Sequence, residues 1–305
     1  MNLIKNIPIP ICGLILALFS LGNLTQEIHP YLRIIFGSIG AIFLILILLK
    51  LIFHTGLIKE DFKNPVIASS SGTFSMSLMI LSTYIITFNP TIAYGVWIIG
   101  IALHILLMIY FTYHFIVHDF NISSVYPTYW IVFVGITMGA ITSGFHGITS
   151  IGFIFFIIGF IAMIITLPLV IYRYIRYPNI PDANKPLICI FTAVLSILIV
   201  GYLNTATAIS IEFVSVLYLF ACIFYVFALL KFIEYKNLDF YPSFAAFTFP
   251  FVISALATKG ILSIMTTNAI LNWMLKIETA IAIVIVCYIL IRYVKFLKNS
   301  NKSRN

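Results

Sequence analysis

Two histidines in the stretch Tyr113–Phe120 have the spacing of a pair of metal ligands. His114 and His118 stand four residues apart, which would place both side chains on one face of an α-helix, and Asp119 follows directly. No further ligand is evident beside them in the sequence, and HExxH, GxSxG and Walker motifs do not occur. We therefore predict no metal site, no cofactor and no enzymatic activity.

Hydroxyl-bearing and small residues form a second polar pattern, inside segments that are otherwise apolar. The stretch ASSSGTFSMS runs from Ala68 to Ser77, and GITMGAITSG runs from Gly135 to Gly144. Hydroxyl groups in a membrane segment usually face other helices or a cavity, and small residues let helix backbones approach closely. As candidate lining of a path through the protein we select Ser71, Gly72, Thr73 and Gly135.

The composition places these stretches in a membrane. Hydrophobic residues make up 62% of the 305 residues and charged residues 9%, and the mean hydropathy is +1.13. A soluble domain does not need so much apolar surface, whereas a membrane-spanning helix needs roughly 20 consecutive apolar residues. The net charge of +8 is then charge in the loops that sets the orientation, and it indicates no nucleic-acid partner.

We place ten spans in one all-α transmembrane domain covering residues 1–305. They run over residues 8–24, 31–54, 66–88, 91–117, 126–144, 148–174, 186–204, 208–232, 241–265 and 270–293. The loops after odd-numbered spans are short, so the spans pair into five helical hairpins. A proline opens each odd span, and the five recur about every 60 residues, as expected of a repeated hairpin: Pro8, Pro65, Pro127, Pro186 and Pro242. The alternative is that these prolines only mark loop ends.

Lys and Arg residues gather on one side of the predicted membrane. The side that holds both termini carries nearly all of them, and only Arg33, Lys259 and Lys276 fall on the other side. Under the positive-inside rule both termini face the cytoplasm. We expect a multi-pass protein of the plasma (inner) membrane.

The odd spans are richer in Gly, Ala, Ser and Thr than the even spans, of which the tenth contains the lipid-suited run IAIVIVCYILI. The simplest arrangement is a quasi-five-fold one, with an inner ring of odd helices lining a pore and the even helices facing lipid. The alternative is an ordinary tightly packed bundle with no path through it.

The charge pattern of the odd spans indicates which solute such a path would carry. These spans contain no Asp or Glu, and Lys259 is their only Lys or Arg. Proton-coupled pumps and cation transporters generally keep carboxylates at membrane depth, whereas uncharged polar groups with basic residues at the cytoplasmic mouth favour anions. This pattern predicts a weakly selective anion route and does not separate a channel from a carrier.

Two motifs carry a resemblance to a known family. The stretch CGLILALFSLGN (Cys12 to Asn23) resembles the first-helix motif of the tellurite-resistance/dicarboxylate transporter family, and AAFTFPFVISALAT (Ala245 to Thr258) resembles its ninth-helix motif. NPV at Asn64–Val66 and KPL at Lys185–Leu187 also fit. The likeness covers nearly the whole chain, and the family includes bacterial tellurite-resistance proteins and plant slow anion channels.

The resemblance implies a pore through the inner helices, each of them kinked at a proline. Phe249 would occlude this pore as its gate, Thr248 and Pro250 would shape the kink that presents the ring, and Gly13 would lie where the first helix approaches the pore. Family members of this type form homotrimers with one pore in each protomer. The sequence departs from the family motifs at Cys12, Ala17, Ser20 and Ala245, which could alter pore width or gating.

The function we predict is an anion channel for small monovalent anions of the chloride and nitrate type, with membrane lipids as its surroundings. The first alternative is a proton- or ion-coupled carrier of C4-dicarboxylate, sulfite or tellurium oxyanions, and the second is a structural or regulatory membrane protein without transport.

Several single residues have two readings. Phe249 could instead fill a gap between helices, as we expect of Phe247. Lys259 could attract anions to the outer vestibule or extend to the lipid headgroups. We interpret Glu212, Lys276 and Glu278 as interfacial and expect His104 to be hydrogen-bonded to a neighbouring helix.

Overall fold

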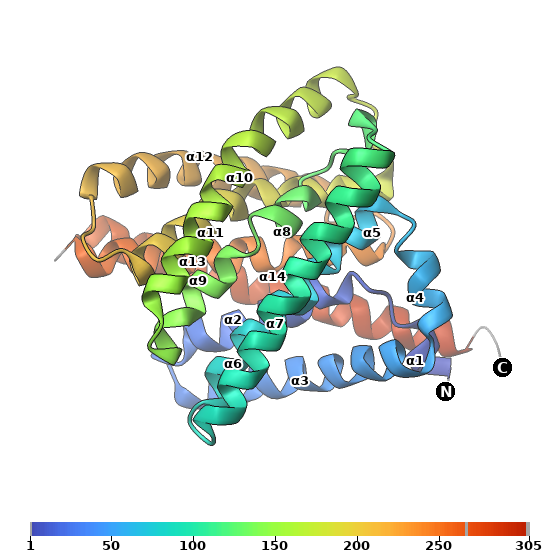
Figure 1. Cartoon of the computed structure of the whole chain (residues 1–305), viewed down its shortest axis with the longest axis horizontal. Helices are drawn as coiled ribbons and strands as arrows, with labels where there is room; N and C mark the ends of the chain where they lie inside the picture. The colour runs from blue at the N-terminus through green and yellow to red at the C-terminus, as the bar shows by residue number, and fades with distance from the viewer. Residues whose placement is uncertain (1, 266–267, 303–305) are drawn as a thin grey trace.

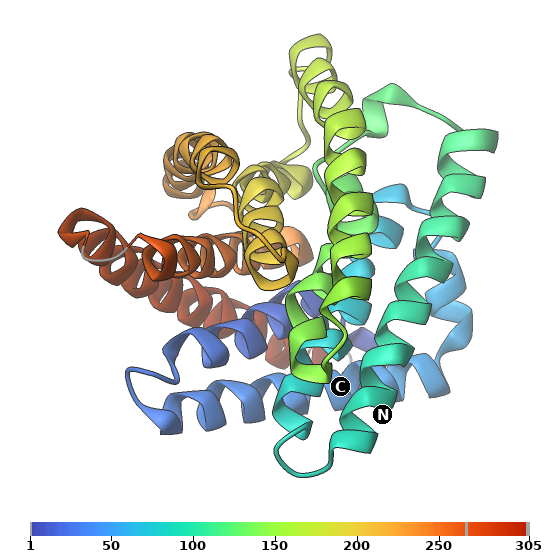
Figure 2. The same cartoon turned by 60° about the vertical axis from the view of Figure 1, so that its left-hand side comes forward.

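The computed structural model describes residues 2–265 and 268–302, and every regular element within these ranges is helical (Figure 1). The first helix of each hairpin packs along the second, in the pairs α2–α3, α6–α7, α9–α10, α11–α12 and α13–α14. Both views show these hairpins spread around a common centre (Figures 1 and 2).

Five long helices form the outer layer of the molecule. They are α3 (Pro30–Phe53), α7 (Pro90–Phe111), α10 (Thr149–Arg176), α12 (Ile211–Tyr235) and α14 (Ala269–Lys302), and α7 continues as a π-helical segment, η1 (Thr112–His118). The start of α7 is specified by two residues. The Asn89 side chain caps the helix by accepting a hydrogen bond from the Ile92 amide, and Pro90 occupies the first turn, where no amide donor is required. In the most apolar stretch of each outer helix only 28–39% of the residues are buried, as expected of helices that face lipid.

The inner segments are each interrupted. They comprise α1 (Asn2–Asn6) with α2 (Ile11–Thr25), α5 (Pro65–Ser70) with α6 (Gly72–Ile85), α8 (Thr128–Phe133) with α9 (Thr137–Ser143), η4 (Asp182–Ile190) with α11 (Phe191–Thr205), and η5 (Pro242–Phe247) with α13 (Phe249–Ile264). Short connecting helices are α4 (Thr55–Asp61), η2 (Ile122–Ser124) and η3 (Gly144–His146). The three inner segments long enough to span a membrane have 67–94% of their most apolar stretch buried.

The inner helices close into a ring. Contacts run from α2 to α6, from α6 to α9, from α9 to α11, from α11 to α13, and from α13 back to α2. The outer helices lie outside this ring, each against the inner helix of its own hairpin. The predicted division into inner, small-residue helices and outer, lipid-facing helices therefore matches the packing.

Polar side chains on the outer helices bond to the backbone of the interrupted inner segments. Lys50 Nζ on α3 donates to the Ile7 carbonyl at 2.7 Å, the His104 ring on α7 contacts the Val132 carbonyl at 3.0 Å, and the Tyr293 hydroxyl on α14 donates to the Pro242 carbonyl. An interrupted helix leaves carbonyl groups without a partner in its own segment, and in a membrane a neighbouring helix must supply one.

Two of the ten predicted spans form helices shorter than a membrane-crossing helix. Eight of the described helical segments are long and apolar enough to cross a membrane. The segment predicted at 8–24 is the shorter apolar helix α2, because the chain turns at Pro8–Pro10 before the helix begins. The segment predicted at 126–144 is divided into two short helices by a break around Gly135.

Candidate functional site: a cavity enclosed by the inner ring

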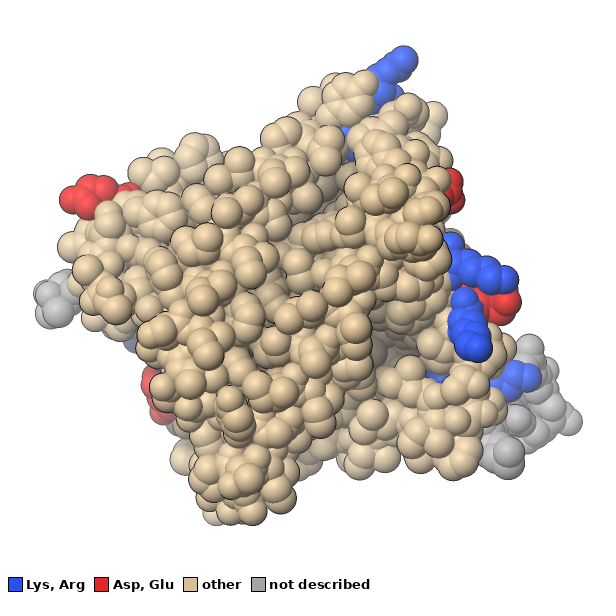
Figure 3. All heavy atoms as spheres, in the orientation of Figure 1, with Lys and Arg blue, Asp and Glu red and all other residues tan. Residues whose placement is uncertain are grey.

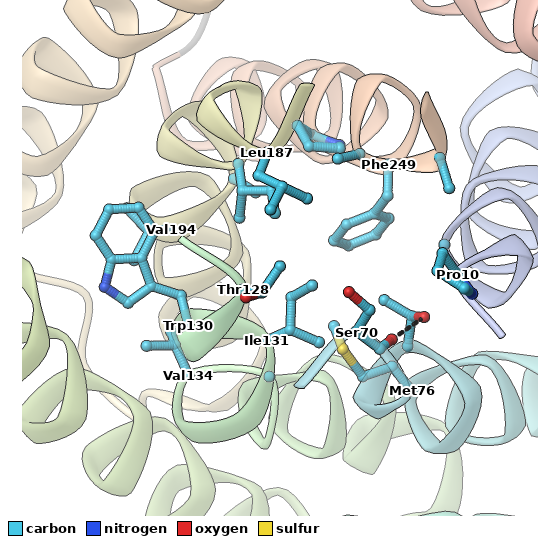
Figure 4. Close-up of a pocket in the computed structure, with 18 of the residues that line it drawn as sticks. Pro10, Ser70, Met76, Thr128, Trp130, Ile131, Val134, Leu187, Val194 and Phe249 are labelled. Carbon is cyan, nitrogen blue, oxygen red and sulfur yellow. Dashed lines mark hydrogen bonds between the residues drawn. The ribbon is translucent and has the colours of Figure 1, made fainter. Parts of the chain in front are cut away.

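A cavity of about 60 Å³ lies at the centre of the ring and has room for a few water molecules or one small ion (Figure 4). All five interrupted segments contribute to its wall. The lining residues are Pro10 and Gly13; Ser70, Thr73 and Met76; Thr128, Trp130, Ile131, Val134 and Gly135; Leu187, Ile190, Ala193, Val194 and Ile197; and Ser243, Ala245, Ala246, Phe249 and Pro250.

The cavity wall carries no ionisable side chain. Two of its hydroxyl groups donate hydrogen bonds to their own helix: Ser70 Oγ to the Val66 carbonyl at 2.6 Å, and Thr73 Oγ1 to the Ser70 carbonyl at 2.7 Å. The other two, Thr128 Oγ1 and Ser243 Oγ, are buried and have no hydrogen-bond partner among the described residues. The wall therefore offers two free hydroxyl groups and no charged group to a small solute.

The Phe249 ring projects into the cavity, between Leu187, Pro10 and Ile131 in the view of Figure 4. A break in the backbone aims it there. Thr248 has φ −97° and ψ −76°, which ends η5, and α13 starts at the next residue. Pro250 has no amide hydrogen and therefore cannot continue the helical hydrogen bonds across the junction.

The break at Thr248 is anchored to the first inner helix. Thr248 Oγ1 donates to the Ala245 carbonyl at 2.6 Å and lies 3.3 Å from the Gly13 carbonyl oxygen. A β-carbon on Gly13 would lie 3.2 Å from Ala245 Cβ, so the absent side chain of Gly13 allows the two segments to approach closely. Thr248 does not line the cavity and instead holds the backbone that presents Phe249.

A second hollow adjoins the central cavity on the side of the molecule that holds both termini. It has a volume of about 390 Å³ and shares Pro10 and Ser243 with the central cavity. Its wall is formed by the first residues of the inner segments together with Lys50 and Asp61. Lys50 Nζ lies 3.5 Å from Asp61 Oδ2, so the mouth of this hollow contains a charged pair.

Five of the candidate residues from the sequence meet at the cavity, whereas Ser71, Gly72, Thr248 and Lys259 lie outside it. Gly13, Thr73, Gly135, Phe249 and Pro250 line the wall. Ser71 faces a separate pocket between the first two hairpins, where it donates to the Ala68 carbonyl. A β-carbon on Gly72 would meet Ile131 and Leu107, which shows that Gly72 is packed between helices.

Ser71 and Gly72 do not line the cavity because of their positions around the helix. The cavity-facing residues of the segment formed by α5 and α6 are Ser70, Thr73 and Met76, which follow one another at intervals of three and so lie on one helix face. Ser71 and Gly72 point to other faces of the same segment. The three-residue spacing was readable in the sequence, whereas Trp130, Leu187, Val194 and the other apolar lining residues carry no signal that separates them from packing residues.

Neither Lys259 nor His146 offers a free positive charge. Lys259 Nζ pairs with Glu27 Oε2 at 2.8 Å, so it presents no net charge to an approaching anion. His146 contacts Ser82 Oγ at 3.0 Å, and burial lowers the pKa of its ring, which is therefore neutral at pH 7. Within the described ranges no group of three or more His, Cys, Asp and Glu side chains is arranged to hold a metal ion.

His104 supports the break at Gly135 from the outer layer. Its Nδ1 atom lies 2.7 Å from Ser75 Oγ on α6, and its Nε2 atom lies 3.0 Å from the Val132 carbonyl. Because a carbonyl can only accept, a neutral ring must donate from Nε2 and accept at Nδ1. The prediction that His104 is hydrogen-bonded to a neighbouring helix is confirmed, and the ring joins the inner segment α5–α6 to the inner segment α8–α9 beside the cavity.

We expect Lys50→Met to lower the stability of the protein by about 1–3 kcal/mol, because the Ile7 carbonyl and Asp61 both lose their partner. The apparent melting temperature of the purified protein in detergent measures this effect. Lys63→Met is the matched control, since Lys63 is exposed and pairs only with exposed Glu60. Equal melting temperatures for the two variants would contradict a structural role for Lys50.

The apolar outer helices and the buried inner helices define a multi-pass membrane protein. A family model described as voltage-dependent anion channel matches residues 6–294, and the chain belongs to this family. It is the tellurite-resistance/dicarboxylate transporter family that the two motifs resemble. Its members are transporters or channels and not enzymes, so the chain serves anion transport across a membrane. No curated protein matches the chain by sequence.

Proposed function

We propose that this protein is an anion channel that passes small monovalent anions, such as chloride and nitrate, through a central pore gated by the Phe249 ring. The observation that carries the proposal is the central cavity: all five inner segments line it, none of its wall residues is ionisable, and an aromatic ring projects into it. An uncharged passage occluded by an apolar ring conducts when the ring moves aside and the pore becomes wetted.

The proposed pore uses ten membrane crossings in a quasi-five-fold arrangement. The closed ring from α2 to α13 supports the five-fold order, and the two short segments, α2 and α8 with α9, complete the ring between longer neighbours. Gly13, Thr73 and Gly135 would line the pore, and Thr248 and Pro250 would set the position of the gate. Three such protomers, each with its own pore, would form the homotrimer.

We assign both termini to the cytoplasm and the protein to the plasma (inner) membrane. Most Lys and Arg side chains visible in Figure 3 lie along the edge where Figure 1 places the two termini and α4. The hollow that contains Lys50 opens at this end, so anions from the cytoplasm would reach the gate through it.

Ion flux through purified protein in liposomes tests the function. We expect chloride and nitrate to leave loaded vesicles down their gradients, with no matching potassium flux and no requirement for a proton gradient. Vesicles without protein give the background rate.

Saturable uptake of malate, sulfite or tellurite that depends on a proton or sodium gradient, together with no chloride flux, would instead support a carrier. The absence of flux for every anion would support a structural role. Either result would contradict the channel.

A further inference from the structure

A buried carboxyl group lies next to the helix that carries the gate. Glu278 on α14, for which the sequence suggested an interfacial position, is only 6% exposed and packs between helices. Within the described residues no Lys, Arg or His nitrogen lies within 4.0 Å of its carboxylate. An acidic side chain buried in a membrane segment without a cationic partner is costly and commonly has a function.

Glu278 is the end of a hydrogen-bond chain that crosses three helices. Thr258 Oγ1 on α13 donates to Glu278 Oε2 at 2.5 Å, and the Tyr218 hydroxyl on α12 lies 2.9 Å from Thr258 Oγ1. Thr258 has one hydroxyl proton, which the carboxylate receives, so Tyr218 must donate to Thr258. The chain therefore runs from Tyr218 through Thr258 to Glu278, and an ionised carboxylate is its strongest acceptor.

The middle member of this chain belongs to the gate helix. Thr258 is fully buried and lies nine residues after Phe249, or about 13 Å along α13 at 1.5 Å per residue. The chain thus ties α13 to both outer helices that flank it. A proton on Glu278 removes its negative charge and leaves a neutral acceptor, for which the hydrogen bond from Thr258 is roughly half as strong.

Other ionisable groups near Glu278 are already engaged or are not charged at neutral pH. Lys259 on α13 pairs with Glu27, and Lys276 on α14 lies over the Trp273 ring at 4.9 Å. The titratable side chains of α12 that face Glu278 are Tyr218, Cys222 and Tyr225. On α2, which also packs against α14, Cys12 is the only titratable residue.

We propose that Glu278 is a proton-binding site that controls how firmly α13 is held, so that protonation loosens the helix that carries Phe249 and increases anion flux. The proposal rests on the proposed function only in its last step, because proton binding and the hydrogen-bond chain do not depend on which ion passes.

Infrared difference spectra of the purified protein between about pH 8 and about pH 6 test proton binding without any transport assay, because exposed Asp and Glu side chains stay ionised over this range. We expect a carboxylic-acid band that grows across this range in the wild type and in Glu212→Gln, but not in Glu278→Gln. Glu212 is the matched control, since it is an exposed acid at the start of α12 that accepts from Ser210. A Glu278→Gln spectrum that retains the band would overturn the proton site, whatever the transport result.

Flux measurements test the coupling to the gate. We expect chloride efflux through the wild type to rise as the pH falls. Chloride efflux through Glu278→Gln should be about fivefold faster than through the wild type at pH 7 and should not depend on pH. Thr258→Val breaks the same hydrogen-bond chain but leaves the Glu278 carboxyl in place. Chloride efflux through this variant should therefore also be faster, and its infrared band should remain. Wild-type flux and wild-type pH dependence in both folded variants would overturn the coupling. If the infrared band behaves as expected but no variant passes anions, the proposed function fails and the proton site stands.

Discussion

Phe249→Ala should increase the anion conductance of the protein at least about tenfold, which corresponds to lowering the barrier by about 1.4 kcal/mol. The wild-type ring projects into the cavity and resists wetting of a narrow passage. Removing it widens the passage, and the side chains that remain around it include Leu187, Pro10 and Ile131. Single-channel recording in planar bilayers measures the effect, and unitary chloride or nitrate steps in the alanine variant are the expected result.

Phe247→Ala is the matched control for this experiment, since it removes an identical ring two residues earlier. Phe247 is fully buried and packs against Phe232 and Phe244, each with ring centroids 5.2 Å away. It does not line the cavity. We expect Phe247→Ala to lower stability by about 3–5 kcal/mol without opening the pore. A folded Phe249→Ala protein that stays silent, or a gain in conductance shared by both variants, would contradict the gate.

Gly135→Ala should lower the stability by about 3 kcal/mol, the upper end of what an overpacked site usually costs. A β-carbon on Gly135 would lie 2.1 Å from the Ile131 carbonyl oxygen, and 2.9 Å from both His104 Cε1 and Met76 Sδ. The carbonyl belongs to the backbone of the break itself, so the segment cannot relieve the contact by moving one flexible side chain. The shift in melting temperature in detergent measures the loss.

The control for this substitution is Gly95→Ala on α7. A β-carbon at Gly95 meets no heavy atom within 4 Å, so we expect a change of less than about 1 kcal/mol, in the stabilising direction given by helix propensity. If Gly135→Ala melts at the same temperature as Gly95→Ala, the break does not depend on glycine. Anion flux through any folded Gly135→Ala protein should also fall, because Gly135 lines the cavity.

The sequence was most informative about the layers of the fold. The outer helices can be predicted from their length and continuous apolar character, and the inner helices from their small residues. The two differ because lipid contact and close packing favour different side chains. The opening prolines fell at or near the starts of the inner segments, since proline is tolerated in a first helical turn.

The positions of the breaks were harder to predict. The break after Ser70 contains no proline, and the break at Gly135 depends on support from His104 of another hairpin. A contact of this kind joins residues far apart in the chain, so no local pattern reveals it. The burial of Glu278 could not be predicted for the same reason. It depends on neighbouring helices that carry Thr258 and Tyr218, whereas the residues next to Glu278 in the sequence are typical of a helix near the membrane surface.

The closed ring also constrains how the protein is made. Its last contact joins α13 to α2, and the polar contact between Thr248 and Gly13 connects residues 235 positions apart. At the usual rate of synthesis of about 5–20 residues per second, the first hairpin leaves the ribosome tens of seconds before its partner exists. During that interval the face of α2 that will meet η5 and α13 is open to lipid or to the insertion machinery. Assembly of this protein in the membrane therefore ends with a docking step, in which the fifth hairpin packs against the first and closes the ring.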